Sequence, residues 1–134
     1  MNRTRILLAD DHLAVREGVA TLLEPDFEVV GMVANGQDML SEAGRLKPDI
    51  VILDISMPLL NGLAAARQLR KNASTSMVVF LTVHDEPEFL RAGLDAGAVG
   101  YVLKCRLTSD LIPAVYEVLA GQHFISPGLH LPEK

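Results

Sequence analysis

Five side chains that can take part in chemistry lie where short apolar runs of the sequence end. They are Asp10 and Asp11 after the first run, Asp54 after the third, Thr82 after the fourth and Lys104 after the fifth. Any one of them alone is typical of a solvated loop or a helix cap. Their shared position at the ends of four separate runs instead favours a common site.

The types of these residues indicate phosphoryl transfer. Three carboxylates packed together repel one another and need a cation to balance them. Oxygen ligands, with no cysteine or spaced pair of histidines among them, favour Mg²⁺, which commonly binds one or two carboxylates together with water and phosphate. Transfer also needs an in-line nucleophile and positive charge around the equatorial oxygens. Asp54 can be the nucleophile, while Lys104 and the metal supply the charge and Thr82 supplies a hydroxyl donor.

The apolar runs themselves predict strands that are buried on both faces, because they are short, aliphatic and do not alternate. The runs cover residues 6–9, 29–33, 50–53, 77–81 and 99–103. Apolar residues at helical spacing lie between them. Pro87 is placed near a helix start, and Gly97 and Gly121 near helix ends. Ser109 is a candidate N-cap for the last helix, expected over residues 109–120.

A βα unit repeated five times predicts an α/β fold, (βα)5, with a doubly wound parallel sheet and helices on both faces. Five strands favour the flavodoxin-like order 2-1-3-4-5, in which ligands bind outside the carboxyl ends of the strands. The five candidate residues lie at those ends. Because the periodicity stops after Gly121, we expect one domain over residues 1–121 and a tail, or the beginning of a linker, over residues 122–134.

Composition limits the other possibilities. One cysteine, Cys105, excludes an internal disulfide framework. The apolar run at residues 6–9 is too short for a signal peptide or a membrane span, so a cytoplasmic location is expected. A net charge of −5 without a run of lysine or arginine argues against nucleic-acid binding by these residues.

At the candidate residues the sequence resembles the receiver domains of two-component response regulators, over residues 5–121. The matching segments, in the order and spacing of that family, are ILLADDH, VILDISMPLLNG, VVFLTVH and GYVLK. The resemblance implies a CheY-like fold and transfer of a phosphoryl group from a sensor histidine kinase to Asp54. It also implies that Mg²⁺ is held by Asp54, directly by Asp11, mainly through water by Asp10, and by the backbone carbonyl of Ser56.

The resemblance further implies a conformational switch. Thr82 and Tyr101 would form it, the hydroxyl moving to the phosphoryl oxygen and the ring turning inward behind it. The chain is then not an enzyme but a phosphoacceptor that assists its own phosphorylation and dephosphorylation. In many receivers a proline after a cis bond follows the lysine; here Cys105 follows Lys104, so a trans bond is expected.

The segments ADDH and GYVLK are most similar to the NarL/FixJ branch, whose members usually carry a C-terminal, LuxR-type DNA-binding domain. Transcription control is therefore the expected output, with DNA contact only through a domain absent from these residues. We favour a chain cut after the receiver over a stand-alone receiver that acts by protein contact. Phosphorylation is expected to change self-association, and no membrane partner is expected.

Three other functions fit part of this pattern but not all of it. A haloacid-dehalogenase-like phosphatase would need a second carboxylate two residues after the nucleophile, where this chain has Ser56. A flavodoxin-like cofactor binder would need a phosphate loop after the first strand, where Asp10 and Asp11 would repel phosphate. A pseudo-receiver, which only binds partners, usually lacks part of the acidic site, whereas this chain has every residue of it. His84, two residues after Thr82, is more typical of a surface loop, although it could touch the water that attacks an acyl phosphate.

Overall fold

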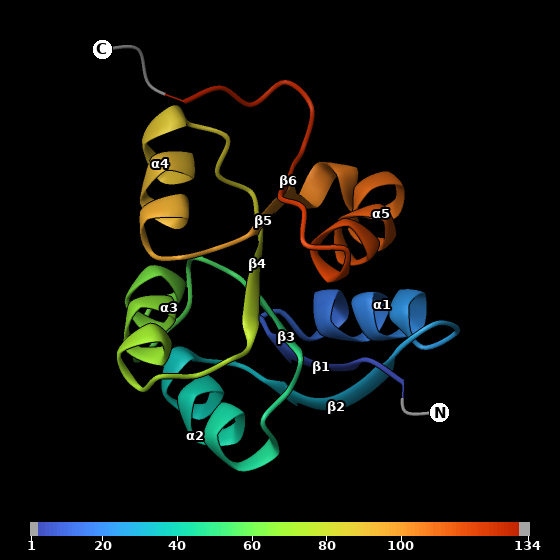
Figure 1. Cartoon of the computed structure of the whole chain (residues 1–134), viewed down its shortest axis with the longest axis vertical. Helices are drawn as coiled ribbons and strands as arrows, with labels where there is room; N and C mark the ends of the chain where they lie inside the picture. Colours follow the sequence, from blue (N-terminus) through green and yellow to red (C-terminus); the bar gives the residue numbers. More distant parts are fainter. Residues whose placement is uncertain (1–2, 132–134) are drawn as a thin grey trace.

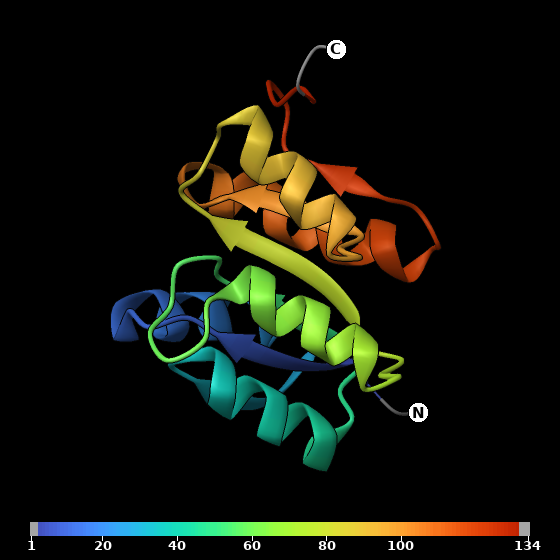
Figure 2. The same cartoon turned by 90° about the vertical axis from the view of Figure 1, so that its left-hand side faces the viewer.

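The computed structural model consists of one parallel β-sheet with helices on both faces (Figure 1, Figure 2). It describes residues 3–131. The strands are β1 (Arg5–Ala9), β2 (Glu28–Val33), β3 (Ile50–Leu53), β4 (Met77–Thr82), β5 (Gly100–Leu103) and β6 (Phe124–Ile125). The helices are α1 (Leu13–Leu23), α2 (Gly36–Leu46), α3 (Gly62–Lys71), α4 (Pro87–Asp95) and α5 (Leu107–Leu119), with a 3₁₀ turn, η1 (Lys104–Arg106), before the last.

The order of the strands is β2-β1-β3-β4-β5-β6, and every neighbouring pair is parallel. The α/β class and the predicted order 2-1-3-4-5 are therefore confirmed. The sheet also has a strand that the sequence does not predict, because β6 lies in the segment expected to be a tail or linker. Two residues are too few to give a periodic pattern, so this strand is defined by its pairing with β5 rather than by local sequence.

Two apolar cores lie on the two faces of the sheet. Along β1, Leu7 and Ala9 pack beneath α2 and α3, whereas Ile6 and Leu8 pack beneath α1 and α5. Figure 1 shows the same division, with α2, α3 and α4 on one side of the strands and α1 and α5 on the other. Because successive residues of a strand point to opposite faces and both faces are covered, these strands are continuously apolar.

Several helix boundaries agree with the signals in the sequence. Helix α4 begins at Pro87, and Gly97 and Gly121 adopt positive φ angles of 99° and 84° just after α4 and α5. The expectation for Ser109 is wrong, because α5 begins two residues earlier, at Leu107. The Ser109 hydroxyl donates to the Arg106 carbonyl and the Asp110 carboxylate, so it stabilises the first turn without capping it.

The loop after β3 is held close to α3. The side chain of Asn61 caps α3 by accepting a hydrogen bond from the amide of Ala64 at 2.9 Å. At Gly62 an added Cβ would lie 1.9 Å from the backbone oxygen of Asp54, which leaves no room for any side chain. Glycine at this position therefore allows the start of α3 to pack directly against Asp54.

Candidate functional site

The carboxyl ends of the strands bring the predicted acidic residues together. Asp10 follows β1 and Asp54 follows β3, the adjacent strand in the sheet, and their exposed fractions are only 5% and 4%. Asp11 lies beside them at the exposed mouth of the site. Ligand atoms of Asp10, Asp11, His12 and Asp54 all lie within 4.8 Å of one another. Carboxylates from two strands thus form one cluster, as the sequence predicts.

Lys104 enters this cluster from the end of β5. Its Nζ lies 2.7 Å from Asp10 Oδ2 and 3.2 Å from Asp54 Oδ2, so one ammonium is shared between two buried carboxylates. Asp10 Oδ2 accepts no hydrogen bond of regular geometry and has only this ion pair. Between residues 3 and 131 no peptide bond is cis, so the bond from Lys104 to Cys105 is trans, as expected.

Burial and charge together shift the pKa values of Asp54 and Lys104. Burial raises the pKa of Asp54 above its usual value, and the nearby Asp10 carboxylate adds to this, although Lys104 opposes it. Burial by itself would lower the pKa of Lys104, but its contacts with Asp10 and Asp54 outweigh burial and raise that pKa. The lysine is therefore held in its charged form, whereas the ionised form of Asp54 is incompletely compensated.

The cluster fits a hard divalent cation. Three carboxylates lie near one ammonium, and within residues 3–131 the buried Oδ2 of Asp10 has that ammonium as its sole partner. Carboxylate oxygens are the ligands that Mg²⁺ prefers. His12, for which the sequence predicts no role, lies within the cluster, with Nδ1 3.2 Å from Asp10 Oδ1 and 3.1 Å from Asp11 Oδ1. That the Ser56 carbonyl also binds the metal stays a prediction.

His84 lies in the loop between β4 and α4, as expected, and is half-buried beside the site. Its Nε2 is 2.8 Å from Ser56 Oγ, and its ring stacks on Phe89 of α4 with the ring centres 4.1 Å apart. The expectation of a loop residue is thus confirmed, whereas contact with the water that attacks an acyl phosphate stays a prediction. Arg16 was not singled out, yet it donates to the backbone carbonyl of Asp10 at 2.6 Å.

The two residues of the expected switch are both fully buried. Thr82 ends β4, and its Oγ1 accepts a hydrogen bond from the His84 amide at 3.1 Å. The ring of Tyr101 points inward, and its hydroxyl donates to the His84 carbonyl at 2.7 Å. Burial raises the pKa of the Tyr101 hydroxyl, and the carboxylates of Glu86 and Asp85 raise it further. His84 thus connects both switch residues through its backbone.

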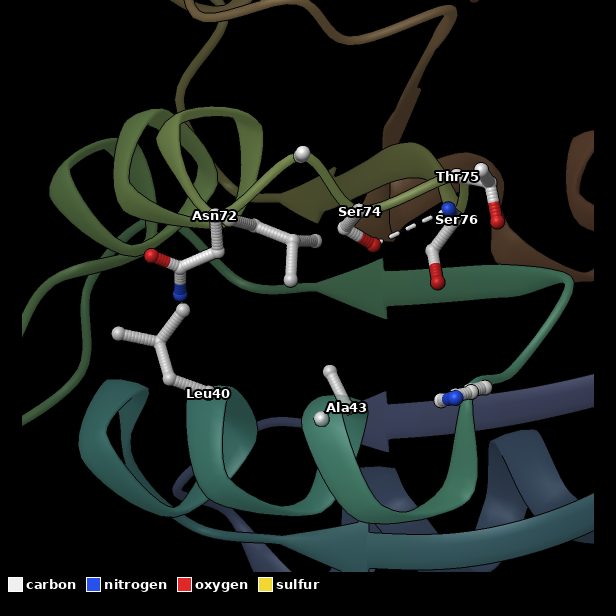
Figure 3. Close-up of a pocket in the computed structure, with 10 residues that line it drawn as sticks. Leu40, Ala43, Asn72, Ser74, Thr75 and Ser76 are labelled. Atoms are coloured by element: carbon white, nitrogen blue, oxygen red, sulfur yellow. Dashed lines mark hydrogen bonds between the residues drawn. The ribbon is translucent and has the colours of Figure 1, made fainter.

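Two surface hollows lie at opposite ends of the strands. One, of about 530 Å³, opens beside the acidic cluster and is lined by Asp11, Ser56 and Phe89, among others. The other, of about 360 Å³, lies between α2 and α3 and the loop before β4; Figure 3 shows Leu40, Ala43 and Asn72 along it. The second hollow has no carboxylate in its lining, so only the first offers a phosphodonor access to the cluster.

Comparison with known proteins places the chain in a family. Residues 6–116 match the response regulator receiver domain. The response regulator GacA of Pseudomonas viridiflava is 39% identical over 125 residues, which are 92% of this chain and 58% of that protein. The transcriptional regulatory protein DegU of Brevibacillus brevis is 37% identical over 128 residues, 94% of this chain and 54% of that protein. The chain therefore spans little more than half the length of these curated relatives.

Solved structures agree with this assignment. A LuxR-family two-component response regulator from Aurantimonas sp. SI85-9A1 has a TM-score of 0.88 and 33% identity, covering 95% of this chain and 91% of that one. The chain thus belongs to the response regulator receiver family, and the resemblance to its LuxR-type branch is confirmed. Within residues 3–131, none of the helices is both long and apolar enough to cross a membrane.

Proposed function

We propose that this receiver accepts a phosphoryl group on Asp54 from a sensor histidine kinase, in a reaction that depends on Mg²⁺. The observation that carries the proposal is the shared ammonium: Lys104 lies within 3.2 Å of both Asp10 and Asp54. A single cation cannot balance the two buried carboxylates and the adjacent Asp11. The cluster is therefore suited to a divalent metal and to an anionic phosphodonor.

Each residue has a role in the transfer. A carboxylate oxygen of Asp54 attacks the phosphorus in line, a new P–O bond forms, and the bond to the donor breaks with its electron pair on the leaving group. Lys104 and the hydroxyl of Thr82 stabilise the charge on the phosphoryl oxygens. The rest of this chemistry is positioning, so the chain is a phosphoacceptor rather than an enzyme acting on outside substrates.

The donor set also indicates where the metal would bind. Asp10, Asp11, Asp54 and the Ser56 carbonyl would hold Mg²⁺, which when bound neutralises the phosphoryl oxygens. After transfer, Thr82 turns toward the phosphoryl group and Tyr101 remains packed behind it. His84, 2.8 Å from Ser56, is suited to contact the water that later hydrolyses the acyl phosphate.

The output is transcription control from the cytoplasm, through a DNA-binding region outside residues 1–134. The relative DegU is a transcriptional regulatory protein, and a net charge of −5 gives the receiver itself little attraction for DNA. Phosphorylation adds roughly −1.5 to −2 charges beside Lys104. We expect the resulting switch to change self-association, which sedimentation with and without beryllofluoride would measure.

The test is phosphorylation by acetyl phosphate with Mg²⁺, followed by peptide mapping of the added mass. We expect one phosphoryl group on the peptide containing Asp54, none in Asp54→Asn, and none when the metal is chelated. Asp26→Asn is the control, because it removes an exposed aspartate that lies outside the acidic cluster. Modification that persists unchanged in Asp54→Asn would disprove the assignment of the acceptor.

A further inference from the structure

Residues 122–131, here called the strap, are docked along the outer edge of β5. The Phe124 amide donates to the Val99 carbonyl at 3.1 Å and the Ser126 amide donates to the Tyr101 carbonyl at 2.9 Å. Phe124 packs on the core beneath α5, and Leu129 packs on the core beneath α4. In Figure 1 the strap accordingly runs from β6 beside α5 toward α4. It therefore joins the two faces of the sheet.

Ser126 is the buried polar centre of the strap, with an exposed fraction of 1%. Its hydroxyl accepts a hydrogen bond from the Leu103 amide at 3.1 Å and donates one to Asp110 Oδ2 at 2.7 Å. The Asp110 carboxylate is held in turn by Arg106 Nε at 2.8 Å and by the Ser109 hydroxyl at 3.0 Å. One hydroxyl thus connects the strap, the end of β5 and the first turn of α5.

This connection reaches the phosphorylation site through one peptide unit. Leu103 is the last residue of β5, and the next residue, Lys104, contacts both Asp10 and Asp54. The Leu103 amide lies on the outer edge of β5, beyond the two-residue pairing of β6. Ser126 supplies its hydrogen-bond acceptor through a side chain instead. The backbone that carries Lys104 is therefore fixed from outside by a residue of the strap.

Building on the proposed function, we propose that Ser126 is a positioning residue for Lys104 that couples docking of the strap to phosphorylation of Asp54. Displacing a reactive group by a fraction of an ångström slows a reaction markedly, so loss of the Ser126 hydroxyl should slow phosphorylation. Coupling between two sites is reciprocal. A phosphoryl group that draws Lys104 toward itself must therefore alter how tightly the strap is docked.

The first test compares Ser126→Ala with the unaltered chain in reaction with acetyl phosphate and Mg²⁺. We expect the rate to fall about fivefold, the factor that one net hydrogen bond represents, with the affinity for Mg²⁺ unchanged. A purely structural defect would weaken both. Ser109→Ala is the matched control, since it also removes a hydroxyl bonded to Asp110 but contacts no residue of β5. We expect its rate to equal that of the unaltered chain.

The second test measures amide hydrogen exchange of Leu103 and Ser126 with and without beryllofluoride and Mg²⁺. We expect the phosphoryl mimic to change exchange at both amides in the unaltered chain and to have no such effect in Lys104→Ala. Strap amides that do not respond in the unaltered chain overturn the coupling, even if Ser126→Ala fails to fold.

The outcomes separate the two proposals. An unaltered chain that takes no phosphoryl group overturns the proposed function together with the coupling. A phosphorylated chain whose Ser126→Ala variant reacts at the same rate overturns the coupling alone. An equal loss of rate in Ser109→Ala also overturns it, because the effect would then come from Asp110 in general rather than from the contact with β5.

Discussion

Asp54 and Asp110 are buried to the same degree, with 4% of each residue exposed, yet their electrostatic environments are opposite. Asp54 lies at the end of β3, and burial together with Asp10 raises its pKa above the usual value. Burial also acts to raise the pKa of Asp110, in the first turn of α5, but hydrogen bonds from Arg106, Ser126 and Ser109 outweigh it and lower that pKa. Low solvent exposure alone therefore does not decide the direction in which the pKa of a carboxyl group shifts.

The difference lies in the number of donors. Both oxygens of Asp110 accept hydrogen bonds, from two side-chain hydroxyls and from Arg106 at 2.8 and 3.3 Å. Asp54 accepts a long contact of 3.4 Å from the Ser56 amide and shares the Lys104 ammonium with Asp10. A buried carboxylate whose oxygens are satisfied holds a structure together. One that is short of donors is available for a metal ion and for chemistry.

The largest effect is expected when the shared cation is removed. Lys104→Ala leaves Asp10 and Asp54 buried and uncompensated, which should lower the free energy of unfolding by about 3 kcal/mol in metal-free buffer. Mg²⁺ should bind at least as tightly as before, since a competing cation has gone, and should restore much of the stability. Urea unfolding with chelator and with Mg²⁺ measures both. Lys71→Ala, an exposed lysine in α3, is the control. A loss that Mg²⁺ does not reduce would contradict this account.

A smaller effect is expected when Asp110 or Asp54 is replaced singly by asparagine. Asp110→Asn weakens several charge-assisted hydrogen bonds and should cost roughly 2 kcal/mol of stability. Asp54→Asn relieves the repulsion from Asp10, so its free energy of unfolding in metal-free buffer should be unchanged or increased. Urea unfolding of both variants provides the comparison. If Asp54→Asn were the more destabilised of the two, the distinction between a satisfied and an unsatisfied carboxylate would be wrong.

The dependence of stability on pH should have opposite signs for the two groups. Asp110 has a lowered pKa, so its contribution is present above the ordinary value of 3.8 and is lost as the pH falls through the folded-state pKa. Asp54 has a raised pKa, so it binds its proton more tightly when folded, and stability is lost as the pH rises from 3.8 through the raised value.

For one proton, the free energy of unfolding can change by at most about 1.4 kcal/mol per pH unit. Urea unfolding of the unaltered chain and the two asparagine variants, in chelator between about pH 3 and 6, separates the contributions. The difference between the unaltered chain and Asp110→Asn should shrink toward the acid end. The amount by which the unaltered chain is less stable than Asp54→Asn should grow toward neutral pH. Parallel curves for all three chains would contradict these assignments.

The acidic site around Asp54 was predictable from sequence, because its residues follow short apolar runs that end at the same edge of the sheet. Parallel strands place their carboxyl ends at one edge, and this alone brings Asp10, Asp54 and Lys104 together. The contacts of Asp110 were not predictable. Asp110 and Ser126 are 16 residues apart, on a helix and an irregular segment whose positions no local pattern relates. The expectation that Ser109 caps α5 was wrong for a different reason: the helix begins two residues earlier, at Leu107, so Ser109 lies inside its first turn.

The smallest effect is expected at Tyr101, a fully buried residue of β5. Tyr101→Phe removes one uncharged hydrogen bond, 2.7 Å from the hydroxyl to the His84 carbonyl, and leaves the ring in its buried place. It should lower the free energy of unfolding by about 1 kcal/mol, with Mg²⁺ affinity unchanged, as urea unfolding and metal titration would measure. Because the substitution touches neither Asp54 nor Asp110, this value gives the contribution of a neutral buried hydrogen bond in the same protein. A loss as large as that of Asp110→Asn would mean that charge adds nothing at Asp110, and its low pKa would then need another cause.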